Sequence, residues 1–379
     1  MNCRRFGTLD FQVSALGFGC MRLPVLGGET SRINEPLAIE MLRTAIDHGV
    51  NYLDSAYPYH GGNSERLIAK ALQGGYRDKV KVATKLPSWA VQEPADFERF
   101  LDEQRGRLQA DRIDFYLLHN LQAGFWRRLR ALGVLDWLEA ARASGRVGHV
   151  GFSFHDSFDV FAEIVEAYRG WALCQIQYNY ANERVQAGTE GLRYAAERGL
   201  AVVVMEPLLG GSLASPPEPI RALWAAAPSP RTPAEWALQW LWNKPEVSAV
   251  LSGMSTMAQV FENVASAGRS AVGSLTDGDL KLVERVRAAY EALYPVPCTR
   301  CGYCMPCPTG VNIPVNMQLY SDAVAFGGTH VQLNTNLYRG LPEEARAGAC
   351  TACRACEEKC PQRIAVSEWM PRIHKHFSR

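Results

Sequence analysis

The sequence predicts an α/β fold: a (β/α)8 TIM barrel over residues 1–294, followed by a small second domain over residues 295–379. Three observations support this prediction. The chain has 379 residues, enough for one large and one small domain. Short β-rich apolar runs alternate with helix-like stretches as far as residue 252, and a proline-punctuated segment follows at 294–297. Eight of the eleven cysteines then lie between Cys298 and Cys360.

The apolar runs have the length and the β-branched content of buried strands. Because helix-like stretches separate them, the strands are expected to be parallel, and eight such units over about 250 residues match a closed barrel. An open doubly wound sheet is the alternative, which the absence of Gly-x-Gly-x-x-Gly after the first run disfavours. Segment 3–13 is expected to form a hairpin that closes the barrel bottom. The expected strands are 14–18, 50–54, 80–85, 113–119, 147–153, 172–177, 200–205 and 247–252, and the expected helices include 36–48, 64–72, 94–108, 135–143, 157–168, 189–198 and 233–242.

The composition excludes several classes of protein. Hydrophobic residues make up 47% and charged residues 21%, a globular balance. Forty Lys and Arg face 39 Asp and Glu, so no global field would gather nucleic acid or an anionic membrane. No apolar run reaches the roughly 18 residues of a membrane helix. The first residues lack the apolar core of a secretory signal, so we expect a cytoplasmic protein.

Polar side chains stand at the ends of successive expected strands, where the loops of a barrel carry reactive groups. Asp54 ends the second strand, Lys85 the third and His119 the fourth. Each has an ordinary structural explanation: a helix cap, a lysine that reaches water along its apolar stem, or a hydrogen-bonded core histidine. Their conjunction, with Tyr57 and Tyr59 beyond Asp54, indicates instead one shared catalytic mouth.

With these residues the sequence resembles the aldo/keto reductase family, from about residue 5 to 267. The matching segments are 51–59 (NYLDSAYPY), 82–85 (VATK), 114–119 (DFYLLH) and 252–263 (SGMSTMAQVFEN). In the family signature the tyrosine stands five residues after the aspartate. This spacing selects Tyr59 over Tyr57 as the matching residue.

The resemblance implies an oxidoreductase in which a nicotinamide hydride reduces a carbonyl, or the reverse oxidation of an alcohol. Tyr59 would be the general acid. A free phenol has a pKa of about 10, too high for efficient proton donation near neutrality. Lys85 would favour the phenolate, Asp54 would hold Lys85, and His119 would orient the carbonyl oxygen.

The cofactor positions match less closely. Gln175 and Ser153 fit the family residues that hold the nicotinamide carboxamide, but Phe154 replaces the usual asparagine and Met205 the usual aromatic residue. No Lys or Arg occurs from 253 to 263, where the family binds a 2′-phosphate. NADPH is therefore the family default that the resemblance implies, and both NADH and a loss of nicotinamide binding remain open alternatives. The implied cofactor-binding residues are Gly19, Met21, Asp54, Ser153, Gln175, Met205, Pro207, Leu208, Gly210, Gly253, Ser255, Gln259, Glu262 and Asn263.

Three further residues are candidates for substrate contacts. Arg22 follows the first strand and would bind an anionic substrate or phosphate, or else form an ordinary surface salt bridge. Trp89 follows Lys85 and would wall the substrate pocket or simply cover the barrel rim. Asn120 directly follows His119.

The cysteines form two runs, Cys298-x2-Cys301-x2-Cys304-x2-Cys307-Pro and Cys350-x2-Cys353-x2-Cys356-x3-Cys360-Pro. The second has the bacterial ferredoxin spacing, in which the fourth cysteine ligates the other of two [4Fe-4S] clusters. One cluster is therefore assigned to Cys298, Cys301, Cys304 and Cys360, and the other to Cys350, Cys353, Cys356 and Cys307. Two zinc sites, each with four cysteine ligands, are the alternative.

The interval between the two runs holds a helix-like stretch at 314–325, which predicts a mainly α-helical ferredoxin-type domain. Barrel and tail together resemble an iron–sulfur subgroup of the aldo/keto reductases. The expected function is reduction of a small carbonyl by NADPH or NADH, coupled to or supported by the two clusters. An external one-electron carrier is a possible partner of the clusters. The alternatives are a ferredoxin-like electron carrier whose barrel binds a partner or ligand without turnover, and a barrel with purely structural clusters.

Overall fold

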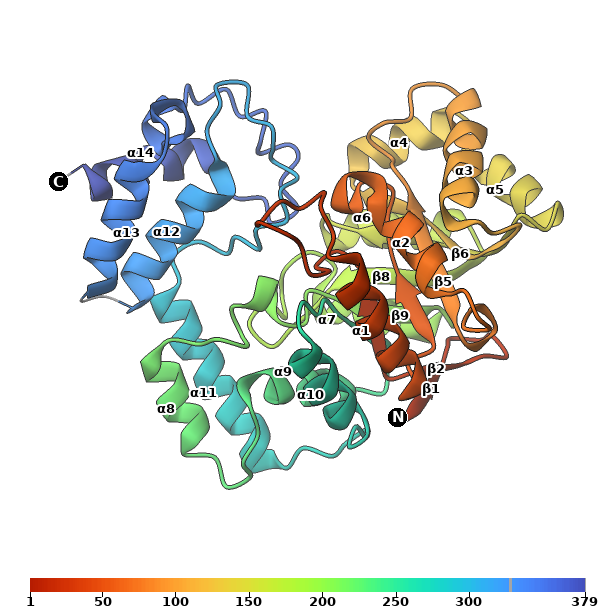
Figure 1. Cartoon of the computed structure of the whole chain (residues 1–379), viewed down its shortest axis with the longest axis horizontal. Coiled ribbons are helices and arrows are strands. Elements are labelled where there is room, and N and C mark those ends of the chain that lie inside the picture. The colour runs from red at the N-terminus through yellow and green to blue at the C-terminus, as the bar shows by residue number, and fades with distance from the viewer. Residues whose placement is uncertain (327–328, 379) are drawn as a thin grey trace. The chain divides into compact units, whose positions relative to one another are not determined.

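The computed structural model describes residues 1–326 and 329–378 (Figure 1). The chain divides into two compact units. One consists of Met1–Pro207 with Glu235–Leu275, and the other of Leu208–Ala234 with Thr276–Arg379. The expected boundary after residue 294 falls just beyond the end of helix α11 (Asp277–Leu293), and it stays a prediction. No helix in the described part of the chain is long and apolar enough to cross a membrane.

The first unit contains the expected barrel, eight parallel strands closed in the order β10-β3-β4-β5-β6-β7-β8-β9. Its strands are buried on both faces, which is why they appear in the sequence as continuous apolar runs. All nine residues of Ile113–Leu121 are buried. The eight expected strands are confirmed as β3 (Leu16–Gly19), β4 (Tyr52–Asp54), β5 (Lys81–Leu86), β6 (Ile113–Leu121), β7 (Val147–Phe154), β8 (Trp171–Gln177), β9 (Ala201–Met205) and β10 (Val247–Ser252).

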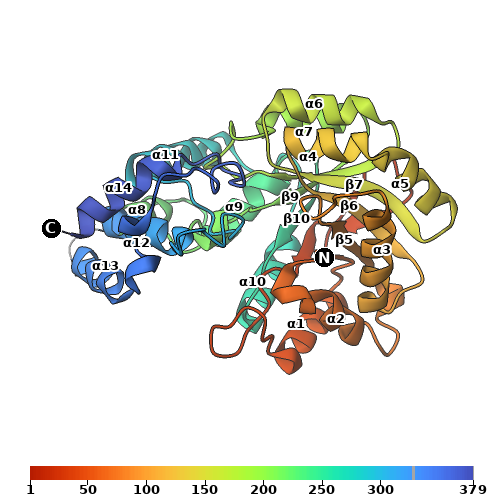
Figure 2. The same ribbon diagram turned by 90° about the horizontal axis from the view of Figure 1, so that it is seen from above.

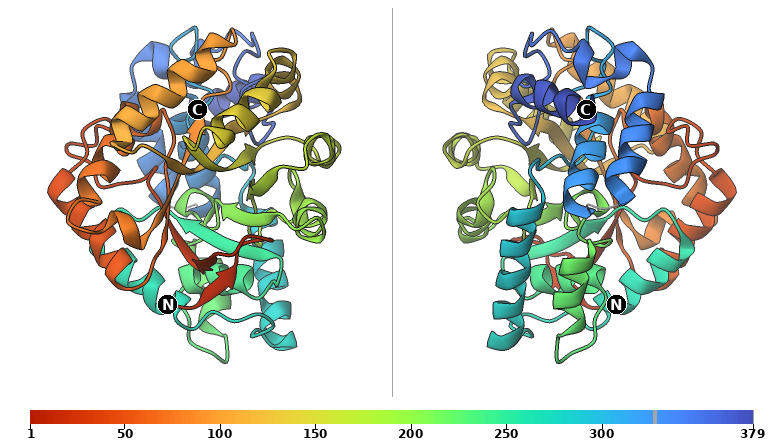
Figure 3. Two further views of the ribbon diagram at one scale, coloured as in Figure 1. Left: turned by 90° about the vertical axis from the view of Figure 1, so that its right-hand side faces the viewer. Right: turned by 90° about the vertical axis from the view of Figure 1, so that its left-hand side faces the viewer.

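The expected N-terminal hairpin also forms, from β1 (Cys3–Arg5) and β2 (Gln12–Ser14) (Figure 3). Its turn places Phe6 in the barrel core, where its ring lies 5.0 Å from that of Phe115. Gly7 has φ +58, and a Cβ there would come within 2.6 Å of backbone atoms of Gly199 and Ala201. The hairpin therefore closes the end of the barrel at which β9 begins.

Helices surround the barrel in the view of Figure 2. All the expected helices of this region are present. Two more, α4 and α10, were not among the expected helices; α4 buries Trp126 and Leu129 on one face. The helices are α1 (Glu35–Asp47), α2 (Asn63–Ala71), α3 (Ala95–Leu108), α4 (Ala123–Ala131), α5 (Val134–Ala143), α6 (Phe158–Ala167), α7 (Gly188–Glu197), α9 (Pro233–Trp242) and α10 (Met257–Ala267).

The second unit is mainly helical, as expected. It contains α8 (Glu218–Ala225), α11, α12 (Ile313–Phe326), α13 (Thr329–Gly340) and α14 (Val366–Phe377). A capping box between Thr276 and Asp279 starts α11. Val311, Met317, Met370, Ile373 and Phe377 belong to a separate apolar core, against which cysteines of both runs pack.

Candidate active site and cysteine pockets

A buried ion pair lies at the ends of the neighbouring strands β4 and β5. Lys85 Nζ is 2.7 Å from Asp54 Oδ1, and the two side chains are 0% and 3% exposed. The ammonium group also donates to the carbonyl oxygen of Ser55 at 2.6 Å. Burial raises the pKa of Asp54, and the charge and hydrogen bond of Lys85 offset part of that shift. Because both charges are shielded from water, their interaction is screened little by salt.

Tyr59 begins a short 3-10 turn, η1 (Tyr59–Gly62), shortly after β4. The Lys85 ammonium lies 5.3 Å from the centroid of the Tyr59 ring. The neighbouring Tyr57 is used differently, because its hydroxyl donates to Glu103 on α3 at 3.0 Å. The structure therefore separates the two tyrosines by environment: Tyr59 faces the buried cation, whereas Tyr57 is bound to a helix.

His119 lies near the end of β6 and is 2% exposed. Its ring packs edge-on against Tyr59, with centroids 6.0 Å apart, and lies 5.0 Å from the ring of Trp89. Burial, and then the charges of Lys85 and His155, hold the pKa of His119 well below its usual value. The imidazole is therefore neutral near pH 7, with one N–H to donate. Asp54, Tyr59, Lys85 and His119 thus come together, with Trp89 beside them.

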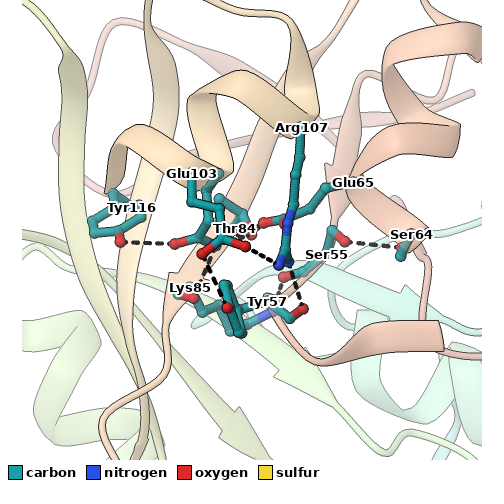
Figure 4. Close-up of polar contacts among 10 residues, drawn as sticks. Ser55, Tyr57, Ser64, Glu65, Thr84, Lys85, Glu103, Arg107 and Tyr116 are labelled. Atoms are coloured by element: carbon teal, nitrogen blue, oxygen red, sulfur yellow. Dashed lines mark hydrogen bonds and ion pairs between the residues drawn. The ribbon is translucent and has the colours of Figure 1, made fainter. Parts of the chain in front are cut away.

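A hydrogen-bonded network that the sequence did not reveal contacts the backbone of Lys85 (Figure 4). Glu65 on α2 is fully buried and accepts from Thr84 and from Gln104, each at 2.6 Å. Gln104 also donates to the carbonyl oxygen of Lys85 at 3.1 Å. Arg107 approaches Glu65 at 3.3 Å and donates to the carbonyl oxygen of Tyr57 at 3.1 Å. The network links α2 and α3 to β5, through Thr84 and the Lys85 carbonyl oxygen, and to the Tyr57 carbonyl oxygen.

The residues expected to hold the nicotinamide lie at the ends of β7 and β8. Gln175 is 2% exposed; its Nε2 meets the Met205 sulfur at 3.6 Å, and its Oε1 has no partner among the described residues. Such a buried amide suits a carboxamide that both donates and accepts. Ser153 accepts from the backbone N–H of Asn120 at 2.8 Å and keeps its own proton to donate. Asn120 itself has the left-handed φ of +58.

The residues expected at the adenosine end follow β10. Ser255 and Gln259 are exposed, and the Ser255 N–H donates to Gln259 Oε1 at 2.8 Å. Asn263 is buried and donates to Ser252 at 2.9 Å. Glu262 is exposed on α10. In the strand that pairs with β10, Gly19 ends β3, and Met21 follows it, half-buried.

The expected pyrophosphate loop is divided between the two units. Pro207 ends a segment of the first unit, whereas Leu208 and Gly210 belong to the second. Gly210 has φ +66, and its carbonyl oxygen accepts from Arg300 at 2.8 Å. Arg300 stands between Cys298 and Cys301, so this loop is bonded to the first cysteine run.

Two cysteine-lined pockets lie in the second unit. One is lined by Cys298, Cys301, Cys304 and Cys360, and the other by Cys307, Cys350, Cys353 and Cys356. Each pocket therefore takes three cysteines from one run and one from the other, as the ferredoxin spacing predicts. All eleven cysteines of the chain are free thiols.

The electrostatics of these pockets suit a cationic group. Burial, and then the neighbouring Cys301, Cys298 and Cys360, raise the pKa of Cys304 to about 12. Burial also raises the pKa of Cys356 to about 11. For Cys307 the opposing effect of burial is outweighed: the Thr309 hydroxyl and backbone N–H groups lower its pKa. Among the described residues, each pocket is lined by four cysteines and by no histidine or carboxylate, a donor set that fits an iron–sulfur cluster.

Comparison with known proteins decides the family. The model of the aldo/keto reductase family matches residues 15–287, and that of the 4Fe-4S dicluster domain matches residues 297–365. This chain belongs to the aldo/keto reductase family. It is an oxidoreductase enzyme with an iron–sulfur domain at its C-terminal end.

Several known proteins resemble this aldo/keto reductase over the barrel. L-galactose dehydrogenase of Arabidopsis thaliana is 28% identical over 291 residues, which cover 69% of this chain and 87% of that protein. A holo-form aldo-keto reductase from Bacillus halodurans has 25% identity and a TM-score of 0.64, with 76% of this chain and 96% of that chain covered. An aldo-keto reductase from Klebsiella pneumoniae in complex with NADPH has 24% identity and a TM-score of 0.61, covering 76% and 95%, and shows the shared fold.

One signal could have revealed the hidden network of this reductase. Gln104 and Arg107 stand three residues apart on α3, so they share one helix face, and Leu101 and Leu108 on the same helix are buried. Polar side chains that interrupt a buried helix face are expected to have buried partners.

Proposed function

We propose that this aldo/keto reductase transfers a hydride between NADPH or NADH and a small carbonyl or alcohol substrate, with Tyr59 as the proton donor. The observation that carries the proposal is the fully buried Lys85–Asp54 ion pair, whose ammonium lies 5.3 Å from the Tyr59 ring centroid. A buried cation at a phenol favours its ionised form, and so eases proton transfer.

Each residue of the site has a distinct task in this reaction. Tyr59 holds a proton on its hydroxyl and passes it to the substrate oxygen as that oxygen gains charge. Asp54 fixes Lys85, and the Ser55 carbonyl oxygen fixes it from a second side. Neutral His119 donates one hydrogen bond to the same substrate oxygen. Trp89 covers His119 and limits access of water to it. In alcohol oxidation the proton moves in the opposite direction.

Gln175 and Ser153 would hold the nicotinamide carboxamide, with Met205 beside Gln175. When bound, the nicotinamide supplies or accepts the hydride. The chain itself sets the position of these groups, because the parallel pairing of β7 and β8 places Ser153 opposite Gln175.

For the second domain we propose two [4Fe-4S] clusters. The composition of the two pockets supports the sets Cys298, Cys301, Cys304, Cys360 and Cys307, Cys350, Cys353, Cys356. Each cluster would carry one electron, so the pair matches one hydride in electron count and would exchange electrons with an external one-electron carrier. The expected compartment is the cytoplasm.

Anaerobic titration with NADH and NADPH, followed by cluster absorbance, tests the proposal. We expect nucleotide binding, about eight iron and eight sulfide per chain, and carbonyl reduction. The substrate panel should include aldoses in the oxidative direction, because one relative is named L-galactose dehydrogenase. Absence of binding by both nucleotides would contradict the reaction. Carbonyl turnover that survives cluster loss would assign the clusters a structural role.

A further inference from the structure

We propose that Arg22 is the cation that binds a phosphate group of the nicotinamide dinucleotide in this protein. The inference rests on the proposed function and identifies a residue that determines cofactor binding there. It starts from a gap in the sequence: from 253 to 263 there is no lysine or arginine. A dinucleotide nevertheless brings two to three phosphate groups that need positive partners.

Arg22 lies against this gap. It stands in the segment between β3 and α1, and β3 pairs with β10 so that Phe18 is opposite Ser252. The Ser255 hydroxyl donates to the carbonyl oxygen of Arg22 at 2.7 Å. This bond, together with the pairing of the strands, fixes the Arg22 backbone beside the segment that follows β10.

The Arg22 side chain also covers Gly253. A Cβ added at Gly253 would come within 3.2 Å of Cβ, 3.3 Å of Cγ and 3.4 Å of Cδ of Arg22. The aliphatic stem of Arg22 therefore occupies the space that a side chain at position 253 would need. Gly253 thus leaves room for the Arg22 side chain. The guanidinium of Arg22, from the segment between β3 and α1, supplies the positive charge that the segment after β10 lacks.

The surroundings favour an anion at this place. Helix α10 begins just beyond, with Thr256 as its N-cap and no acidic residue in its first turn. The free N–H groups of a helix N-terminus attract negative charge. The planar guanidinium of arginine matches phosphate geometry with two hydrogen bonds, and Arg22 is only half-buried, so a ligand can reach it.

Dissociation constants for NADPH, NADH, 2′,5′-ADP and ADP, measured by calorimetry, test the proposal. The main variant is Arg22→Met, which keeps an apolar stem over Gly253 and removes the charge. Arg32→Met is the matched control, because Arg32 is an arginine of the same segment whose side chain is 58% exposed and forms an ion pair with Glu29. We expect Arg22→Met to weaken binding about 10- to 150-fold, the worth of one charge-assisted contact. Arg32→Met should bind like wild type.

The ligand series identifies the phosphate. A loss confined to NADPH and 2′,5′-ADP assigns Arg22 to the 2′-phosphate, and an equal loss for all four ligands assigns it to the pyrophosphate. Arg22→Lys should recover part of the affinity, and Gly253→Ala, which presses on the stem, should weaken binding with the charge retained. Wild-type affinity in Arg22→Met would overturn the proposal. If wild type binds no ligand of the series, the proposed function fails instead.

Discussion

The barrel mouth, meaning the site formed by Asp54, Tyr59, Lys85 and His119, and the two cysteine pockets balance their charges in different ways. In the mouth, Lys85 and Asp54 neutralise each other inside the protein. In the pockets, thiols crowd together, and the pKa of Cys304 rises to about 12 because burial and neighbouring cysteines oppose its ionisation. The charges in the barrel mouth are therefore balanced by protein groups alone. In the proposed clusters, bound iron would offset the cost of ionising buried cysteines such as Cys304 and Cys356.

The largest expected effect concerns the mouth alone. Tyr59→Phe removes the proposed proton donor, so carbonyl reduction should fall by about 10²- to 10⁴-fold. Nucleotide dissociation constants and iron content should stay at wild-type values. Steady-state kinetics and equilibrium titration measure the two properties separately.

Tyr57→Phe is the matched control, because it removes a hydroxyl two residues away that binds Glu103. It should keep most of the activity. Wild-type activity in Tyr59→Phe, or an equal loss in both variants, would show that Tyr59 is not the donor.

The second effect concerns the pockets alone. Cys304→Ala and Cys353→Ala remove one ligand from different proposed clusters, so each should lose about four of eight iron atoms. Loss of the metal should destabilise the second domain, while the separate core of the barrel remains folded. Iron assay and limited proteolysis followed by mass spectrometry measure both outcomes. Cys174→Ala, a buried barrel thiol, serves as the control and should retain full iron.

The two regions also differ in what the sequence could predict. The strands and the strand-end residues were predictable because a parallel barrel produces continuous apolar runs that end in polar side chains. Cysteine spacing likewise predicted the crossed membership of the two pockets. The position of Arg22 over Gly253 was not predictable, because it depends on which loops meet above the paired strands β3 and β10.

The order of segments along the chain also does not show which of the two compact units each segment joins. Residues 208–234 follow barrel strand β9 closely, yet they belong to the compact unit that carries the cysteines. Contacts such as the Tyr290 hydroxyl donating to the carbonyl oxygen of Ser212 at 3.1 Å join segments far apart in sequence. Local patterns in a sequence do not report contacts of this kind.

The third effect concerns pH and the barrel. Burial lowers the pKa of His155 to about 4. The pKa of His155 in the unfolded chain is about 6.5. Between about pH 6.5 and pH 4 the unfolded chain binds a proton at His155 and the folded chain does not, so the free energy of unfolding falls as the pH drops through this range. From pH 7 to pH 5 this histidine alone should remove about 2 kcal/mol. His155→Gln should show a smaller loss than wild type in urea unfolding at the two pH values. An equal loss of stability in both proteins would show that His155 is not the group responsible.

The last expected effect concerns the choice of cofactor. Thr256→Arg places a cation where the family carries its phosphate-gripping residue, and one charge-assisted contact is worth about 1.5–3 kcal/mol. The preference for NADPH over NADH should rise by about tenfold or more, with the NADH dissociation constant unchanged.

Thr256 also caps α10, since its hydroxyl accepts from the Gln259 N–H at 3.3 Å. Any replacement should therefore cost about 0.5–2 kcal/mol of stability. Thr256→Ala separates the two effects, because it loses the cap without gaining a cation. The decisive quantity is the ratio of the NADPH and NADH dissociation constants in Thr256→Arg against Thr256→Ala. The cap is lost in both variants and cancels, so the ratio reports the new phosphate contact. An unchanged ratio would mean that the 2′-phosphate does not lie at the start of α10, and the adenosine end of the site would have to be placed elsewhere in the barrel mouth.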